Sequence, residues 1–488
     1  MEQGRIILFA KLTNLSPLGI GSGRSDHSDR DVVRSRYFLD KKGNIVPVSM
    51  VTKDDKPMDL PFIPATTFMG KIHSLLKEDA SLDDYWGESM VNASMIDCSD
   101  VLITAFPKYA KQDLSDLLEI RDGIRLNSET GIVAKGAKFD YEVVGPDTEF
   151  EVTMVFRVED NFKLAFQIAS SVADIIEKGF DLGAKSTVGF GRMTASTVKL
   201  FKLDFNVPEQ FANWIRNELL VDEIPSRDPA FLIDVKDHFT INATFRIKNS
   251  LIIRSYSKDP GMPDSTHLKS GGKPVISGTS IKGALHSRAE RILNTIQSDI
   301  GITETMLASL FGDVEKEKSD KQTVKKKGYT VPSRLDVDEV PVDKSTVSEE
   351  VQTRIQIDRF TGGTIDGALI EEVPLFPVKE LDQVKNFRIS VKDAQPEDKG
   401  LLLLLLKDLW TEDLPIGGER SIGRGVLTGI SADVVDGGKH FNFKKAGDKI
   451  IFPENMESLQ QYVDTLNRIT NLDFHTNRVD GYKKKKNG

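Results

Sequence analysis

Two aspartates, Asp29 and Asp264, stand at equivalent places in two similar stretches of the chain. From Asp264 the sequence reads Asp-Ser-Thr-His-Leu-Lys-Ser and continues as Gly-Gly-Lys-Pro-Val-Ile-Ser-Gly-Thr-Ser-Ile-Lys. A single carboxylate can act as a general base or hold a divalent cation beside a phosphate. Because no dense group of further acids surrounds Asp264, the sequence does not indicate a two-metal nuclease centre.

Basic residues and a helix start follow Asp264. Lys269 comes directly after the acid loop, and the apolar spacing predicts a helix from about Thr279, capped by Thr279 or Ser280. A helix N-terminus behind a Gly-containing turn can hold an anion, and Lys282 would lie in its first turn. These features together favour contact with a phosphate backbone.

The stretch around Asp264 has a second copy around Asp29. Asp29–Ser35 aligns with Asp264–Ser270, and the same ungapped register pairs Asn14 with Asn249. After an insertion, residues 60–74 align with 273–287, which brings His73 onto His286. A repeat of this length indicates a duplicated domain and not a solenoid.

Two further assignments stay open in these copies. Asp26 and Asp31 flank Asp29, so any of the three could be the acid of the first repeat, with Asp29 matching best and Asp26 next. His73 and His286 recur on the expected helices, where a histidine is more often a core or capping residue than a catalytic one.

Each half ends in a Gly-rich loop. Gly183, Gly189 and Gly191 in the first half align with Gly417, Gly423 and Gly425 in the second. Glycines allow a ligand to approach the backbone closely and expose amide N–H groups. No Gly-Lys-Ser/Thr follows, so neither loop is a P-loop.

A Gly-containing hairpin is predicted in each half before that loop. Residues 124–139 align with 355–370, so that Thr130-Gly131 matches Thr361-Gly362. Two strand-like runs around a Gly-rich connection favour a β-hairpin with a mobile tip.

Composition limits the class of protein. The chain has 488 residues, a formal net charge of −9 and one cysteine, Cys98, which excludes a disulfide framework and fits a reducing cytosol. The start of the chain lacks a signal-peptide pattern, and the six leucines 401–406 are too few to span a bilayer, so we expect a cytoplasmic protein and a buried leucine helix. The acidic balance suits a subunit among partners more than a solitary nucleic-acid binder.

The order of elements in each half is strand, helix, strands with a hairpin, helix, Gly-rich loop and strand. This order predicts an α+β fold with two tandem ferredoxin-like, RRM-like domains, each carrying a hairpin insertion. We expect domain 1 over residues 1–225, a polar linker over 226–234 and domain 2 over 235–488.

These motifs resemble the RAMP superfamily. The resemblance rests on the Gly-rich loops, the Pro-x-Ile-x-Gly/Ala-Thr/Ser-Thr/Ser turn and Ile-Asp-Arg-Phe-Thr-Gly-Gly-Thr-Ile-Asp-Gly-Ala-Leu at 357–369. Within the superfamily the chain is similar to the repeated backbone subunit of type III CRISPR effector complexes, in the tandem-fused form of type III-D. The match is good throughout the second repeat, and the hairpin of the first repeat is degenerate.

The resemblance implies an antiviral subunit that binds crRNA along a groove. Its partners would be the other subunits of a CRISPR effector complex, and it would not bind a membrane. Thumb-like hairpins at 355–375 and 124–144 would insert into the guide–target duplex, and an aspartate with Mg²⁺ or Mn²⁺ would cut complementary target RNA. By this resemblance, the cutting aspartate corresponds to Asp264 in the second repeat and to Asp29 in the first, and the same two residues would be metal ligands. The expected thumb residues are Phe360, Thr361, Gly362, Gly363, Thr130 and Gly131. The expected RNA-binding residues are Arg34, Lys185, Arg192, Lys269, Lys282, Arg359, Arg420, Arg424, Gly183, Gly189, Gly417 and Gly423.

Two other functions remain open from the sequence. The chain could be a non-catalytic crRNA scaffold in which the aspartates only shape loops. It could also be a stand-alone crRNA-processing endoribonuclease, a class that usually acts through a histidine. The tandem repeats and the thumb motif favour the target-cleaving subunit and the crRNA scaffold over the stand-alone processing enzyme.

Overall fold

The computed structural model describes residues 3–23, 28–41, 44–46, 50–87, 92–110, 114–126, 133–159, 161–216, 222–233, 238–256, 261–297, 299–314, 330–378, 381–447, 449–469 and 472–484. Its contacts divide the chain into two compact units. Unit 1 comprises Met1–Leu126, Ile132–Ser186 and Phe190–Val235, and unit 2 comprises Asn127–Gly131, Thr187–Gly189 and Lys236–Gly488. Phe231, in the segment expected as a linker, is buried in the core of unit 1. The domain limits given above stay predictions.

Unit 1 contains a large sheet in which the paired strands run antiparallel, in the order β10-β11-β1-β9-β6-β4-β2-β3, with β12 beside β11 and β5 beside β9. A separate hairpin joins β7 and β8. The strands are β1 (Gln3–Asn14), β2 (Arg34–Leu39), β3 (Ile45–Val46), β4 (Lys56–Ile63), β5 (Ile96–Cys98), β6 (Val101–Ala105), β7 (Leu118–Leu126), β8 (Val133–Val144), β9 (Glu149–Glu159), β10 (Phe180–Asp181), β11 (Arg192–Asp204) and β12 (Asp222–Glu223). The helices are α1 (Ala65–His73), α2 (Ala80–Trp86), α3 (Leu114–Leu117), α4 (Phe162–Lys178) and α5 (Pro208–Ile215).

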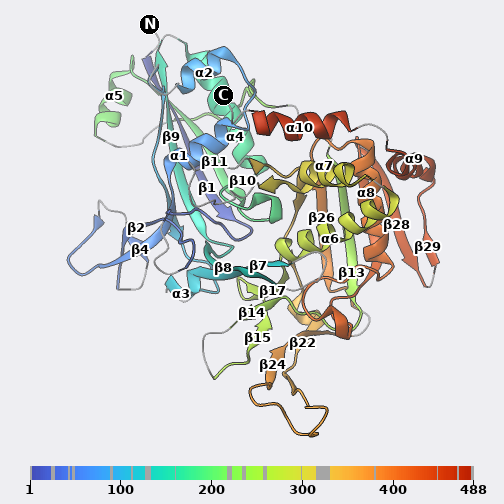
Figure 1. Cartoon of the computed structure of the whole chain (residues 1–488). Helices are drawn as coiled ribbons and strands as arrows, with labels where there is room; N and C mark the ends of the chain where they lie inside the picture. The colour runs from blue at the N-terminus through green and yellow to red at the C-terminus, as the bar shows by residue number, and fades with distance from the viewer. Residues whose placement is uncertain are drawn as a thin grey trace, which may run out of the picture. The chain divides into compact units, whose positions relative to one another are not determined.

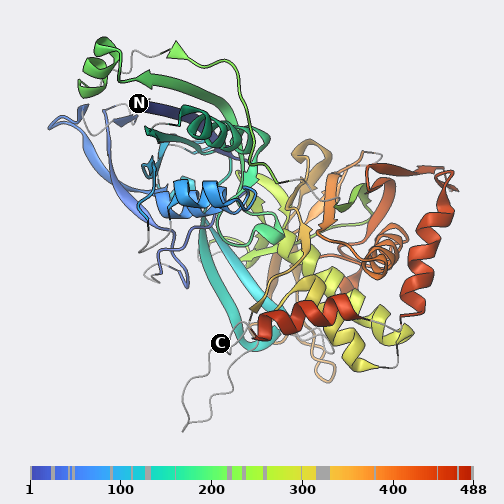
Figure 2. The ribbon, with the colours of Figure 1, turned by 90° about the horizontal axis from the view of Figure 1, so that it is seen from above.

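Alternation of apolar residues builds this sheet. Every second residue of β9 from Phe150 to Val158 is buried, so one face of the strand packs on the core. Figure 2 shows α4 lying along β1 and β11, against which it packs. Asn161 starts α4 by accepting a hydrogen bond from the Leu164 N–H (3.0 Å), and Gly179, with φ 85°, ends it.

Unit 2 has a main sheet in the order β20-β26-β13-β27-β28-β29 and a smaller sheet in the order β14-β15-β24-β23. Its strands are β13 (Phe239–Ile247), β14 (Arg254–Tyr256), β15 (Ser265–His267), β16 (Lys269–Ser270), β17 (Lys273–Ile276), β18 (Asp313–Val314), β19 (Thr330–Val331), β20 (Leu335–Val337), β21 (Val340–Pro341), β22 (Val347–Glu349), β23 (Gln352–Arg354), β24 (Ile370–Val373), β25 (Leu375–Pro377), β26 (Val384–Val391), β27 (Leu427–Asp436), β28 (Lys439–Ala446) and β29 (Lys449–Ile451). Its helices are α6 (Gly278–Ile296), α7 (Ile300–Phe311), α8 (Pro396–Trp410), α9 (Met456–Asn467) and α10 (Asp473–Lys484).

The two units share a central arrangement. β1 lies between β11 and β9 in unit 1, and β13 lies between β27 and β26 in unit 2, with antiparallel pairing in all four cases. In unit 1 the helix α4 lies in the chain between β9 and β11, and in unit 2 the helix α8 lies between β26 and β27. The mixed helix-and-sheet architecture expected from the sequence is therefore present twice.

α8 contains the run of leucines. Leu401, Leu402 and Leu405 are fully buried in the core of unit 2, which confirms the buried helix expected there. Pro396 is the first residue of α8, and Asp398 accepts a hydrogen bond from the Gln395 N–H (3.0 Å). Among the residues described, no helix has the length and apolar character needed to cross a membrane.

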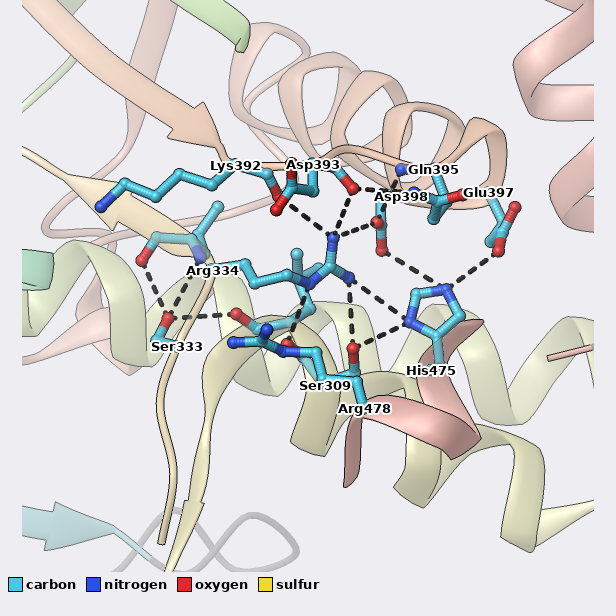
Figure 3. A network of polar contacts seen from close by, with 12 residues as sticks. Ser309, Ser333, Arg334, Lys392, Asp393, Gln395, Glu397, Asp398, His475 and Arg478 are labelled. Atoms are coloured by element: carbon cyan, nitrogen blue, oxygen red, sulfur yellow. Dashed lines mark hydrogen bonds and ion pairs between the residues drawn. The ribbon is translucent and has the colours of Figure 1, made fainter. Parts of the chain in front are cut away.

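A buried polar network holds the C-terminal helix α10 in unit 2 (Figure 3). The Arg334 guanidinium, 2% exposed, pairs with Asp398 at 2.8 Å and donates to the Ser309 carbonyl (3.2 Å). His475 of α10 contacts the Ser309 hydroxyl through Nδ1 (3.0 Å) and Glu397 through Nε2 (2.9 Å). If α10 moved away, buried charges of the network would lose their partners, which costs several kcal/mol. The network therefore holds α10 against α7 and α8.

Candidate acid sites and nucleic-acid interface

Asp264 lies in the loop directly before β15 and is exposed. β15 pairs in parallel with β24, and the Glu371 N–H of β24 donates a hydrogen bond to Oδ2 of Asp264 (2.9 Å). The carboxylate is therefore fixed to the strand that leaves the 355–369 segment, while it remains open to solvent. A carboxylate in this position is accessible to a large molecule outside the protein.

Asp29 is held in the same way. The Asp140 N–H of β8 donates to Oδ2 of Asp29 (2.9 Å), and the Asp29 N–H donates to Oδ1 of Asp140 (2.9 Å). Asp140 aligns with Glu371 when the two hairpin sequences are superposed from Ile124 and Ile355. The two repeats thus hold their acid through an amide at the same position of the same strand.

Among the acids that flank Asp29, the structure gives Asp31 a structural role. Asp31 is buried and accepts hydrogen bonds from the Ser28 N–H (2.8 Å) and the Ser28 hydroxyl (2.9 Å). Its carboxylate therefore shapes the loop that presents Asp29. Asp26 lies outside the described residues.

Among the described residues, a metal site built from several protein ligands is not found around these acids. In the part of the chain that the structure describes, no group of three or more His, Cys, Asp or Glu residues could hold a metal ion. Mg²⁺, however, commonly keeps several waters and takes only one or two carboxylates together with substrate phosphates. The exposed carboxylates of Asp29 and Asp264 fit that mode of binding.

The histidines near the acids have structural partners. His267 is 1% exposed; its Nδ1 accepts from the Ile253 N–H (3.2 Å), and its Nε2 donates to the Val275 carbonyl (3.0 Å). Burial lowers the pKa of His267 to about 4, so the ring is neutral at pH 7.

The recurring helix histidines pack on aromatic rings. His73 stacks on Trp86 at 4.9 Å between ring centroids, and His286 meets Phe311 edge to face, also at 4.9 Å. The sequence pairs Tyr85-Trp-Gly with Leu310-Phe-Gly, so a histidine–aromatic contact occurs at matching positions in both repeats, stacked in the first and edge to face in the second. This packing gives the recurring histidine a structural role in both repeats.

The two Gly-rich loops have matching backbone hydrogen bonds. The Leu182 N–H donates to the Gly191 carbonyl (2.8 Å), as the Ile416 N–H does to the Gly425 carbonyl (2.9 Å). A Cβ on Gly191 or Gly425 would lie 1.7 or 2.0 Å from the carbonyl oxygen of Leu182 or Ile416, so a side chain does not fit at either position. Both glycines also have positive φ, 73° and 79°.

The other glycines of these two loops, which were predicted to contact RNA, also have positive φ. It is found at Gly183, Gly189, Gly417 and Gly423, whose φ values lie between 83° and 95°. These glycines are therefore required by the loop fold itself, and their contact with RNA stays a prediction.

The predicted RNA-binding cations differ in how far they are exposed. Exposed ones are Arg359, Arg420 and Lys269, of which Lys269 pairs with Glu349 at 2.8 Å. Arg34 is partly buried and pairs with Glu142 at 2.7 Å, and Arg192 is half-buried.

Lys282 and Arg424 do not have the surface position that was expected of them. The Lys282 ammonium turns inward and donates to the Ser333 hydroxyl (2.7 Å) and the Leu335 carbonyl (2.9 Å). Burial lowers the pKa of Lys282 to about 8. Arg424 is 2% exposed and pairs with Glu419 at 2.7 Å. Sequence spacing alone could not place them, because each is turned by packing toward an internal acceptor.

The start of α6 also differs from expectation. The helix begins at Gly278, and Ser277 caps it, because the Ser280 N–H donates to the Ser277 hydroxyl (3.3 Å). Thr279 and Ser280, the expected caps, lie in the first turn. Ser277 is buried, so this helix end is closed by its own side chain.

An arginine–glutamate cluster at the base of the 355–369 segment was not expected from the sequence. Arg254 and Arg354 each pair with both Glu372 and Glu419, and Arg424 also pairs with Glu419. Burial would raise the pKa of Glu372, but its hydrogen bonds and the two nearby arginines hold it below its usual value. The cluster joins β14, β23 and β24 to the Gly-rich loop, and we call it the ion cluster.

The 355–369 segment extends away from the strands of unit 2 (Figure 1). Asp358 accepts hydrogen bonds from the N–H groups of Phe360 and Thr361, both at 2.8 Å, and these lower its pKa. The turn presents Phe360 with 99% of its surface exposed, while Thr361, Gly362 and Gly363 beside it are also exposed. Thr130 and Gly131, the counterparts in the first repeat, lie outside the described residues.

Comparison with known families gives one match. The model of the RAMP superfamily matches residues 11–194, most of which belong to unit 1, and residues 244–428 of unit 2, together more than half of the chain. A comparison with curated proteins gives no match. RAMP proteins bind crRNA within multi-subunit CRISPR complexes, and the superfamily includes some ribonucleases.

Proposed function

Because the chain belongs to the RAMP superfamily, we propose that it is the crRNA-binding backbone subunit of a type III CRISPR effector complex, and that it cleaves complementary target RNA. The observation that carries the proposal is the pair of exposed acids, Asp29 and Asp264, each held by an amide at the same position of its repeat. Two equivalent sites in one chain fit a tandem fusion of the type III-D kind. We further propose that each repeat has a ferredoxin-like core with a thumb hairpin, 355–375 and 124–144.

The proposed reaction uses a nucleophile that the RNA itself brings. The 2′-OH of the target nucleotide loses its proton to the carboxylate of Asp264 or Asp29, and its oxygen attacks the adjacent phosphorus. The bond from phosphorus to the 5′-oxygen breaks, and that oxygen takes a proton from water. The products are a 2′,3′-cyclic phosphate and a 5′-OH. Mg²⁺ or Mn²⁺, when bound, would neutralise charge on the phosphate.

The thumb supplies the geometry that this reaction needs. In-line attack requires a nucleotide whose 2′-oxygen is brought opposite the leaving oxygen. Phe360 offers an exposed ring on which a base of the guide–target duplex can stack. Asp264 is bonded to β24, the strand that leaves the same segment, so thumb and acid are mechanically linked.

One observation favours a non-catalytic scaffold as the second candidate. Among the described residues, no group of three metal-ligating side chains surrounds Asp29 or Asp264, so these acids are also consistent with a role in shaping their loops. A stand-alone, histidine-dependent processing enzyme is less well supported, because His73, His267 and His286 pack on rings or bond to the backbone.

The direct test is to purify the chain with its co-expressed partner subunits and to extract the bound RNA. We expect a guide RNA of defined length, and cleavage of complementary RNA in Mg²⁺ but not in a chelator. Guide binding without cleavage would establish the scaffold in place of the nuclease. Absence of bound RNA would contradict both.

A further inference from the structure

The residue two positions after the first glycine of each Gly-rich loop has an unusual backbone. This residue is Lys185 in the first loop and Glu419 in the second, and their φ values are 63° and 58°. A residue with a Cβ is strained in the left-handed region and persists there only where its surroundings hold it. The two loops therefore hold different side chains in the same strained conformation.

In the first repeat, Lys185 is held by aromatic rings of the hairpin strand. Its Nζ lies 3.8 Å from the centroid of the Tyr141 ring and 5.1 Å from that of Phe139, both on β8. Burial, and to a smaller extent Arg30, lowers the pKa of Lys185 to about 8, which leaves it mostly charged at pH 7. A cation over aromatic faces in a desolvated place is a substantial contact.

In the second repeat, Glu419 reaches the hairpin strand through arginines. It pairs with Arg254 (3.1 Å) and with Arg354, and both arginines also pair with Glu372 of β24. Glu372 is 1% exposed, so this end of the connection is fixed in the core of the small sheet. Two neighbouring glutamates repel one another, but here each arginine pairs with both of them, so the arginines link Glu419 to Glu372.

The two connections end at equivalent strand positions. Tyr141 follows Asp140, whose N–H holds Asp29, and Glu372 follows Glu371, whose N–H holds Asp264. The repeats use a cation–π contact in one case and an ion-pair bridge in the other. A contact that only stabilised its own loop would have no reason to end beside the acid-holding amide in both repeats.

We propose that Lys185 and Glu419 are positioning residues that couple each Gly-rich loop to the amide that orients the acid. Their effect on catalysis rests on the proposed function. RNA bound at a Gly-rich loop fixes, through Lys185 or Glu419, the carboxylate of Asp29 or Asp264 relative to the target phosphate. The coupling is local, so each residue serves the acid of its own repeat.

The first experiment measures the coupling without any reaction. Hydrogen exchange is followed in the full chain without RNA for Lys185→Met, Lys185→Arg and the matched control Lys202→Met, because the Lys202 ammonium also lies over a ring, that of Phe162, at 4.2 Å. We expect the segment 138–144, which contains the Asp140 amide, to exchange about tenfold faster in Lys185→Met only. Lys185→Arg keeps a cation over Tyr141 and should restore protection. Equal exchange in Lys185→Met and in the unchanged protein would overturn the inference.

The second experiment measures cleavage in the assembled complex. Glu419→Gln is compared with Glu412→Gln, because Glu412 also has a left-handed backbone, with φ 71°, and pairs with Lys248 away from the hairpin. We expect Glu419→Gln to lower the cleavage rate at one target position about tenfold while KM, guide content and the other position are unchanged. Loss at both positions, or equal loss in both variants, would overturn the inference. If the unchanged complex cuts neither position, the proposed function fails, and the exchange experiment still decides the coupling.

Discussion

Two neighbouring arginines of the second Gly-rich loop illustrate how burial decides the role of a charged residue. Arg420 is exposed, whereas Arg424 is 2% exposed and pairs with Glu419. We expect Arg420→Gln to weaken RNA binding and to lower the slope of log affinity against log salt by about 1, because one phosphate contact is lost.

The matched variant Arg424→Gln should act on the fold instead. Removing one partner of a buried pair leaves Glu419 less compensated, and we expect a loss of about 3 kcal/mol in the free energy of unfolding. Urea unfolding and RNA titration at several salt concentrations measure both effects. An Arg420→Gln variant with an unchanged salt slope would contradict an RNA contact at this loop.

Lys282 gives a second prediction at the residue scale. Its pKa of about 8 lies below the ordinary value of 10.5, so the unfolded chain binds more protons than the folded one between these pH values. Lys282 therefore adds stability as the pH rises from about 8 to 10.5. Lys282→Met should lose this gain, as measured by urea unfolding at pH 7.5 and 10, and should bind RNA as the unchanged protein does. A marked loss of RNA affinity would show that Lys282 contacts RNA after all.

His267 provides the acid-side counterpart. Because its pKa is about 4 in the folded chain, against an ordinary 6.5, the unfolded state binds the extra proton. Its contribution to stability is present above pH 6.5 and is lost as the pH falls from 6.5 to 4. We expect His267→Asn to cost about 1–3 kcal/mol at pH 7 and to flatten the fall in stability between pH 6.5 and 4. An unchanged pH profile would contradict the buried, neutral imidazole.

The 355–369 segment makes the clearest prediction at the scale of an element. Phe360 is 99% exposed at a turn that Asp358 holds, so Phe360→Ala should not disturb the fold. Because stacking of a base on an aromatic ring is worth about 1–3 kcal/mol, we expect cleavage at one target position to fall by about fivefold or more while guide binding is unchanged.

A suitable control for this variant is Phe452→Ala, because Phe452 is also exposed, at 56%, but lies beyond β29 and away from the segment. A kinetic comparison of the two variants in the assembled complex makes the test. Equal cleavage by Phe360→Ala and Phe452→Ala would rule out the thumb role for Phe360.

Elements with strong local patterns could be predicted from the sequence. The helix expected before the Gly-rich loop of each half is present as α4 and α8, because the apolar spacing and the flanking Asn, Pro or Gly residues act locally. The expected alignment of Asn14 with Asn249 was wrong. The Leu15 N–H bonds to the Arg192 carbonyl as the Lys248 N–H bonds to the Val426 carbonyl, so Leu15 corresponds to Lys248. The loops that follow differ in length, which an ungapped comparison cannot detect.

The candidate site could be predicted only in part. Asp264 and Asp29 stood out because their surroundings repeat, and the structure gives them equivalent contacts. The ion cluster could not be predicted, because Arg254, Arg354 and Glu372 are far apart in sequence and meet only when β14, β23 and β24 pair. The sequence around a single charged residue does not show which residue it will pair with in the folded protein.

At the scale of the whole molecule, duplication is the main result. Each unit repeats a strand between two antiparallel neighbours, a connecting helix, a Gly-rich loop and an exposed acid. With a net charge of −9, the proposed RNA binding would depend on local groups of cations and on partner subunits. The proposed function then requires two independent cleavage positions in one subunit.

The central claim is tested most directly by cutting end-labelled target RNA with complexes that contain the unchanged chain, Asp264→Asn, Asp29→Asn or both changes. Both aspartates are exposed loop residues, so stability should change little. We expect each single variant to lose one distinct product by about a hundredfold or more, the double variant to lose both, and all four complexes to bind target equally. Single variants that leave the product pattern intact, or that abolish target binding, would contradict the account.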